Sequence, residues 1–175
     1  MNKQIIKQQN KYNMKKIICM ALCAIALMAC KDEKPTPPPV VKSNSYIGLL
    51  SVTQSDGSVY EQQNLTISVK INDNNTADIT MLQVKFAESM PFFLTTMNIQ
   101  GVATAAVSGG LSLSGDNIVP TATTPMAPGV VAPYPSYTMT GLTGKLTNET
   151  LTLSMMCGLD TPLPLTFSGE VAKTM

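Results

Sequence analysis

The stretch Leu65-Thr66-Ile67-Ser68-Val69-Lys70-Ile71-Asn72 decides the fold. Its apolar and polar side chains alternate at period two, which is the pattern of a β-strand with one buried face. The cluster Asp73-Asn74-Asn75 follows at once, and residues of this kind favour a tight turn. These residues therefore predict a strand that ends in a turn and pairs with the segment after it.

That next segment, residues 77–86, carries apolar residues of both parities. Ala77, Ile79 and Met81 share one parity, and Leu82, Val84 and Phe86 share the other. We expect the apolar face to switch between Met81 and Leu82, through a β-bulge or because both faces are buried.

Working outward, most of residues 43–175 read as further short strands separated by turn residues. The other strand candidates are Tyr46–Thr53, Val59–Gln63, Phe93–Gly101, Ser108–Ser114, Ser136–Leu142, Leu151–Cys157 and Leu163–Val171. Eight or nine antiparallel strands and no amphipathic helix predict an all-β domain, either a barrel or a β-sandwich. The interval Pro120–Pro135 holds five prolines and is expected to be a long loop, either a binding loop or a loose surface excursion.

Composition narrows the chemistry. The 175 residues suffice for one domain and include no His, no Trp and no Arg. Imidazole acid/base catalysis and His metal ligands are therefore excluded, and nucleophile-elbow, phosphate-loop and metal-spaced Cys motifs are absent from the sequence. We expect no enzyme activity, no metal and no cofactor.

The charge is unevenly distributed along the chain. Residues 1–29 hold five Lys and no acid, which leaves seven Lys against eleven acidic residues in the remainder, a formal charge of −4. Nucleic-acid binding depends on a basic surface that neutralises phosphates, so no nucleic-acid partner is expected.

The basic leader runs into an uncharged apolar segment, residues 17–29, which is too short to span a bilayer and fits the hydrophobic region of a signal peptide. It ends in Leu27-Met28-Ala29-Cys30, which resembles the lipobox of bacterial lipoproteins. Residues 1–29 are thus predicted to be a signal peptide, with Met14 as an alternative start. Cys30 is the predicted lipid attachment site, acylated with palmitate or a similar chain, and the membrane is its partner.

Residues 30–42 combine charge with a Pro-rich run and are predicted to be a tether. Lys31-Asp32-Glu33 resembles an export signal that sends lipoproteins to the outer face of the outer membrane. We expect a lipid-anchored protein of the outer membrane at the cell surface, with the periplasmic face as the alternative. Residues 43–175 form the predicted domain, in which Cys157 is the one thiol left and is expected to be a small buried residue.

The domain resembles the calycin-like domain of bacterial lipoproteins from Tyr46 to Val171. The resemblance rests on order and spacing of the opening segment 46–52, the turn and strand from Asn72 to Phe86, the segment 98–102 and the closing strand 163–169. It implies a lipocalin-like, up-and-down barrel of eight strands that binds a lipid or another small apolar ligand. The Gly-x-Trp of true lipocalins is missing, because the chain has Gly48-Leu49-Leu50.

An eight-stranded barrel is just wide enough to be filled by side chains or to hold one small ligand. Carrying the parity of Leu65 across neighbouring strands gives the candidate ligand-binding residues Ile79, Met81, Met97, Met139, Leu153 and Met155. Met suits an adaptable apolar pocket and a closed irregular core equally. The alternative function is an adhesive or accessory β-module that contacts a partner protein or a glycan. Scarce aromatics disfavour sugar stacking, with Tyr60, Tyr134 and Tyr137 as the candidate platforms.

Overall fold

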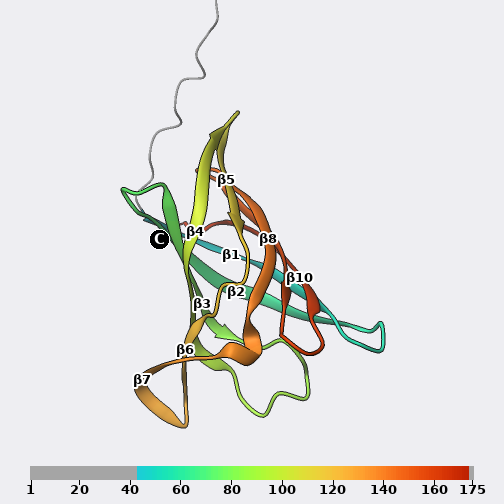
Figure 1. The fold of residues 1–175 in the computed structure, drawn as a ribbon. Coiled ribbons are helices and arrows are strands. Elements are labelled where there is room, and N and C mark those ends of the chain that lie inside the picture. The colour runs from blue at the N-terminus through green and yellow to red at the C-terminus, as the bar shows by residue number, and fades with distance from the viewer. Residues whose placement is uncertain (1–42, 174–175) are drawn as a thin grey trace, which may run out of the picture. The chain divides into compact units, whose positions relative to one another are not determined.

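The computed structural model describes residues 43–173, so the predicted signal peptide, Cys30 and the tether lie outside the described residues. Ten strands form one antiparallel sheet (Figure 1). They are β1 (Ser43–Thr53), β2 (Val59–Ile71), β3 (Thr76–Val84), β4 (Leu94–Val107), β5 (Gly110–Gly115), β6 (Thr121–Thr124), β7 (Ala127–Pro133), β8 (Met139–Leu146), β9 (Thr150–Cys157) and β10 (Leu163–Val171). A single 3₁₀ turn, η1 (Pro135–Tyr137), precedes β8.

Eight of these strands close into a barrel. Each barrel strand pairs with the next one along the chain, and the last strand pairs with the first. The barrel strands are, in chain order, β1, β2, β3, β4, β5, β8, β9 and β10. Every pairing is antiparallel, so the chain runs up and down around the barrel. The expected all-β, up-and-down barrel is confirmed, and the β-sandwich alternative is wrong because the sheet has no break between two layers.

The two ends of the barrel are built differently. At the terminal end lie Ser43, Val171 and the turns β2–β3, β4–β5 and β8–β9. At the loop end lie the β1–β2 turn, the β3–β4 loop of residues 85–93 and the connections that lead into β8 and β10. Ser43, where the described chain begins, and the longer loops therefore lie at opposite ends of the barrel.

The barrel interior is the hydrophobic core. Leu65, Ile67 and Val69 are each 1% exposed or less, and Ile71 is partly buried, so the strand that alternates at period two does have one dry face. Fully burying such an aliphatic side chain contributes about 1.5–3 kcal/mol. Repeated on eight strands, this alternation holds the barrel together.

Aromatic side chains close the interior at both ends. At the terminal end Tyr46 is buried, and its hydroxyl donates to the carbonyl O of Thr147 at 2.8 Å. At the loop end the rings of Phe86 and Tyr137 lie 5.4 Å apart. The amide of Gln54 donates to the Phe86 carbonyl O at 2.9 Å, which ties the β3–β4 loop to the β1–β2 turn.

The apolar face of β3 does switch, but at Gln83 and not between Met81 and Leu82, and the pairing of β3 with β4 stays in register across it. Gln83 has a left-handed backbone (φ 52°), after which Val84 is buried. Leu82 does not join Val84 and Phe86 on the inner face as predicted, since it is 38% exposed on the outside. A second left-handed residue, Asn64 (φ 56°), interrupts β2.

The expectation that residues 120–135 lack sheet structure is wrong. β6 pairs with β4 beside Thr96–Asn98, along the line of β5, and β7 pairs back onto β6. Pro128 and Pro133 are tolerated because β7 is an edge strand and needs amide donors on one side alone. The resulting hairpin projects from the barrel (orange, lower left in Figure 1).

Candidate functional site

The six candidate ligand-binding residues converge inside the barrel. Met81 on β3 lies opposite Met97 on β4, and Ile79 lies opposite Ile99. Met139 on β8 lies opposite Cys157, and Leu153 and Met155 on β9 face Phe167 and Leu165 of β10. All six side chains are 3% exposed or less. The parity prediction therefore placed them on the inner face, whereas ligand binding by them stays a prediction.

This interior offers apolar contact and little else. The buried polar side chains of the described residues are Thr124 and Thr138, and the Thr138 hydroxyl donates to the carbonyl O of Pro135 at 2.7 Å. Within residues 43–173, no buried side-chain nitrogen or oxygen lacks a hydrogen-bond partner. Such a lining can hold an aliphatic molecule by dispersion and burial, but it has no group that would orient a polar one.

Cys157 lies at the loop end of this interior. Its thiol is buried, and its Sγ lies 3.8 Å from the carbonyl O of Tyr137. Burial raises the pKa of the Cys157 thiol to about 12. The thiolate is the reactive form of cysteine, so at neutral pH this side chain is an inert core residue.

A cleft opens where β2 and β3 separate. Their last pair is Thr66 with Leu82, so residues 59–64 of β2 have no partner in β3. β2 has a bulge beside Asn64, where its register against β1 shifts, and Gln83 of β3 has a left-handed backbone at the same point. The result is a cleft of about 680 Å³ at the loop end. Its size falls within the range of about 300–1,000 Å³ typical of small-molecule sites.

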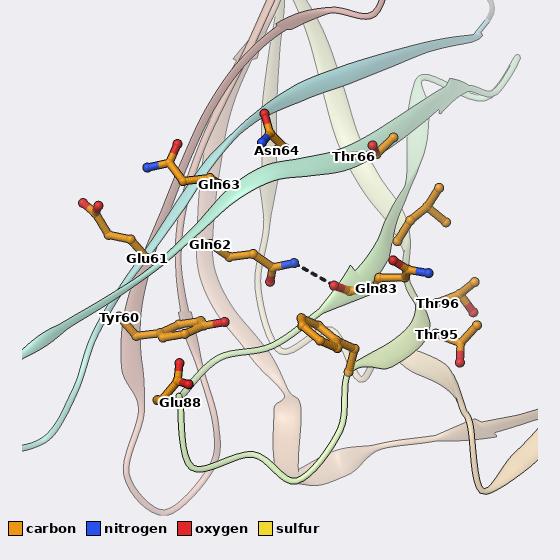
Figure 2. A pocket seen from close by; sticks show the side chains of 12 residues that line it. Tyr60, Glu61, Gln62, Gln63, Asn64, Thr66, Gln83, Glu88, Thr95 and Thr96 are labelled. Carbon is orange, nitrogen blue, oxygen red and sulfur yellow. Dashed lines mark hydrogen bonds between the residues drawn. The ribbon is translucent and has the colours of Figure 1, made fainter.

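The side chain of Gln62 bridges this gap in the sheet. Its Nε2 donates to the carbonyl O of Gln83 at 2.7 Å, and its Oε1 accepts from the backbone N–H of Lys85 at 3.0 Å. Figure 2 shows the amide reaching across from β2 to the backbone of β3. Gln62 lies opposite the buried Leu50, so a polar side chain occupies an inward position and replaces a missing ladder hydrogen bond.

The cleft is lined by side chains of mixed chemistry. Amides, carboxylates and hydroxyls alternate with two aromatic rings and one aliphatic side chain. The lining residues are Tyr60, Glu61, Gln62, Gln63, Asn64, Thr66, Leu82, Gln83, Glu88, Phe93, Thr95 and Thr96.

Tyr60 and Glu88 face each other across one side of this cleft (Figure 2). Burial raises the pKa of Tyr60, and the negative charge of Glu88 raises it further. On the other side, Phe93 is 44% exposed, and the Lys85 ammonium lies 4.9 Å from its ring centroid. The other two candidate platforms lie outside the cleft lining, because Tyr137 packs against Phe86 and Tyr134 packs against Tyr137.

A second cleft of about 620 Å³ continues from the first toward the β1–β2 turn, and the two share Tyr60, Glu61 and Glu88. In that turn Asp56 accepts hydrogen bonds from the hydroxyl and the backbone N–H of Ser58, which lower the pKa of Asp56. Both clefts therefore lie at the loop end, opposite Ser43.

Sequence reasoning missed these clefts. The apolar alternation that located the interior says nothing about a polar inward residue such as Gln62. The available signal was the run Gln62-Gln63-Asn64, in which the alternation of β2 breaks off just before Leu65. An Asn at such a break is compatible with a left-handed bulge, because Asn tolerates positive φ better than most residues.

No group of three or more Cys, Asp or Glu side chains in residues 43–173 is arranged to hold a metal ion. Nor does the range contain a helix with the length and apolar character needed to cross a membrane.

No family model matches the chain, and comparison with curated proteins and with solved structures finds no similar protein.

Proposed function

We propose that the protein is a non-catalytic, lipid-anchored binding module whose barrel takes a lipid or another small apolar molecule. The observation that supports this most is the interior itself, where methionines of β3, β4, β8 and β9 are buried in an apolar core that eight strands enclose. The ligand class is that of a fatty acid, a sterol-like molecule or a compound of similar polarity. Kinship with calycin-like lipoproteins belongs to the same proposal.

Methionine makes such an interior adaptable. Its unbranched side chain has three rotatable bonds and a polarisable sulfur, so it repacks around an incoming molecule at lower cost than a β-branched residue. Met81, Met97, Met139 and Met155 are all buried, so a ligand in the interior would pack against their side chains. The Phe86 and Tyr137 rings lie at the loop end, so a ligand that enters there would pass them.

Anchoring is the second part of the proposal. Cys30 follows the apolar segment directly, and acylation of its thiol would fix the mature chain to the outer membrane, at the cell surface. Two or three acyl chains on one residue suffice for stable membrane attachment. Labelled palmitate should enter the wild-type protein but not the variant Cys30→Ser. Equal labelling of both proteins would show that the anchor lies elsewhere.

The interior is tested with an apolar fluorescent probe and tryptophan substitutions. Met97→Trp and Met139→Trp each add bulk at the centre of the barrel. If the interior takes a ligand, each variant should lose at least tenfold in probe affinity and keep a urea midpoint near that of the wild type. In a core without room, the same change overpacks and costs about 1–3 kcal/mol.

Met126→Trp is the matched control, because Met126 is 80% exposed on the β6–β7 hairpin and stands outside the core. It should alter neither probe affinity nor the urea midpoint. A wild-type protein that binds no probe, together with strongly destabilised Met97→Trp and Met139→Trp variants, would disprove the apolar-ligand function.

The exposed face of the β6–β7 hairpin favours one alternative, an accessory module that contacts a partner protein. Met126, Val130 and Val131 are 80%, 58% and 60% exposed, and no charged residue occurs from 117 to 144. An apolar, charge-free projection is typical of interaction surfaces. Native mass spectrometry separates the two functions: a co-purified small-molecule mass supports the first, and a barrel without one that also binds no probe supports the second.

A further inference from the structure

We propose that the cleft between β2 and the β3–β4 segment binds a neutral oligosaccharide. The site is distinct from the barrel interior, so the inference goes beyond the apolar-ligand function and does not depend on it. It rests on the side chains that line the cleft, on their free hydrogen-bonding groups and on their charge.

Primary amides are concentrated at this site. Residues 43–173 contain five glutamines, and three of them, Gln62, Gln63 and Gln83, line this cleft together with Asn64. An amide both donates and accepts hydrogen bonds in one plane, as a pair of neighbouring sugar hydroxyls does. Gln62 is occupied by the backbone of β3, whereas within the described residues Gln63, Asn64 and Gln83 make no side-chain hydrogen bond. The amides of Asn64 and Gln83 are thus free to pair with a polyhydroxylated ligand, whereas that of Gln63 points to the side of β2 opposite Gln62 (Figure 2).

Two aromatic rings supply the apolar half of the recognition. Tyr60 and Phe93 come from β2 and from the end of the β3–β4 loop, and both line the cleft. The face of an aromatic ring carries partial negative charge and packs against weakly positive C–H groups, which a pyranose ring presents on its faces. Phe93 is 44% exposed, so its ring is accessible to a ligand in the cleft.

The charges select against acidic sugars. The cleft lining contains the carboxylates of Glu61 and Glu88 and no Lys. A carboxylate accepts hydrogen bonds from hydroxyl groups but repels uronates, sulfates and phosphates. Lys85 stands at the edge over Phe93, where it occupies the position that a cationic ligand would take on that ring. A neutral, hydroxylated ligand can donate hydrogen bonds to Glu61 and Glu88 without charge repulsion.

The dimensions favour more than one sugar unit. The cleft of about 680 Å³ runs into its neighbour of about 620 Å³ through Tyr60, Glu61 and Glu88. The two hydrogen bonds of Gln62 hold the walls of the cleft in place before any ligand arrives, which reduces the ordering cost of binding. Its position at the loop end, away from Ser43, leaves it accessible from outside.

The experiment uses the full mature chain, purified in a detergent without a sugar headgroup. It is applied to an array of neutral glucose, mannose, galactose and N-acetylglucosamine oligosaccharides of several linkages, with hyaluronan and polygalacturonate fragments as the acidic set. The strongest neutral compound is then measured by titration calorimetry. We expect binding to at least one neutral oligosaccharide and none to the acidic fragments.

Two variants locate the binding site. Phe93→Ala removes an exposed ring, and Gln83→Gly removes a free amide while suiting the left-handed backbone there. Each should weaken binding at least tenfold with thermal unfolding unchanged or raised. Val107→Ala, on an exposed residue at the end of β4, is the control and should bind as the wild type does. The proposal is wrong if no neutral oligosaccharide binds, if the acidic set binds better, or if either cleft variant binds normally.

Discussion

Cys157 shows what burial does to a single ionisable side chain in this barrel. It ends β9 with its thiol inside, between the core and the carbonyl of Tyr137. With a pKa of about 12 it stays protonated in the folded state well above the pH at which an unfolded cysteine ionises, which is about 8.5.

The thiol therefore makes stability depend on pH in a defined direction. Below about pH 8.5 both states keep the proton, and the full contribution of the neutral thiol to folding is present. From there to about pH 12 the unfolded state alone loses the proton, so the free energy of unfolding should fall by up to about 1.4 kcal/mol per pH unit. Urea unfolding at pH 8, 9 and 10 measures this slope.

Cys157→Ala provides the comparison for that slope. Its slope should be clearly smaller, and what is left should come from Tyr46, Tyr60 and Tyr137, whose pKa values are also raised by burial. Identical slopes for the wild type and the variant would mean that the thiol is not shielded from water.

At the residue scale, sequence reasoning succeeded where alternation is strict. Met97 and Met139 were placed on the inner face from parity alone, because successive side chains on a strand point to opposite faces. The cleft was not predictable in the same way. Gln62 points inward because its amide replaces ladder hydrogen bonds to Gln83 and Lys85, and partners 21 and 23 residues away leave no local pattern.

Among the elements, the contact between β1 and β10 closes the barrel and depends on glycine. Gly48 lies opposite Gly169, and a Cβ built at Gly48 would overlap the carbonyl O of Ser168 and the Cα of Gly169. Both are backbone atoms of the neighbouring strand and cannot rotate away. The two strands therefore approach more closely here than side chains would permit.

Gly48→Ala should accordingly destabilise the protein by about 2–3 kcal/mol, measured as the free energy of unfolding in urea. Gly109→Ala is a matched control in the β4–β5 turn, where φ is +77° and an added Cβ meets nothing within 4 Å. It should cost about 1 kcal/mol from backbone conformation alone. Equal losses in the two variants would indicate that close strand approach is not the cause.

The β6–β7 hairpin shows why the sequence predicted a loop where the structure has two paired strands. Five prolines between 120 and 135 argued against sheet pairing. In the structure Pro133 pairs with Thr121 at the edge of the hairpin, where its missing N–H points away from β6, and Pro120 accepts from the N–H of Tyr134 instead. Whether a strand lies at an edge is a property of the whole sheet.

For the molecule as a whole, the two ends of the described chain lie together. Tyr46 pairs with Val171, and the N–H of Ala172 donates to the carbonyl O of Ser45 at 2.8 Å. The closed sheet is thus continuous across the chain termini. Sequence alone predicted a meander of about eight strands but left barrel and sandwich open, because the β1–β10 register links residues more than a hundred positions apart.

This adjacency predicts tolerance to circular permutation. Joining Lys173 to Ser43 by a short flexible linker and opening the chain between Pro125 and Met126 leaves all eight barrel strands intact. Such a permutant should keep a strand-dominated circular dichroism spectrum and a midpoint of thermal unfolding within several degrees of the unpermuted domain. A permutant opened between Leu153 and Ser154 should fail to fold, since β9 is then divided. Equal behaviour of both permutants would show that barrel closure is not what stabilises the molecule.

The position of Ser43 at the start of β1 also determines how the barrel bears mechanical force. β1 is paired with β2 at ten positions and with β10 at seven, and it runs from the terminal end toward the loop end. Its ladder hydrogen bonds stand perpendicular to the strand. A pull on Ser43 against something held at the loop end therefore acts along β1 as shear, which loads both ladders together instead of peeling them one bond at a time. The barrel should therefore resist mechanical unfolding most strongly when it is pulled along this axis.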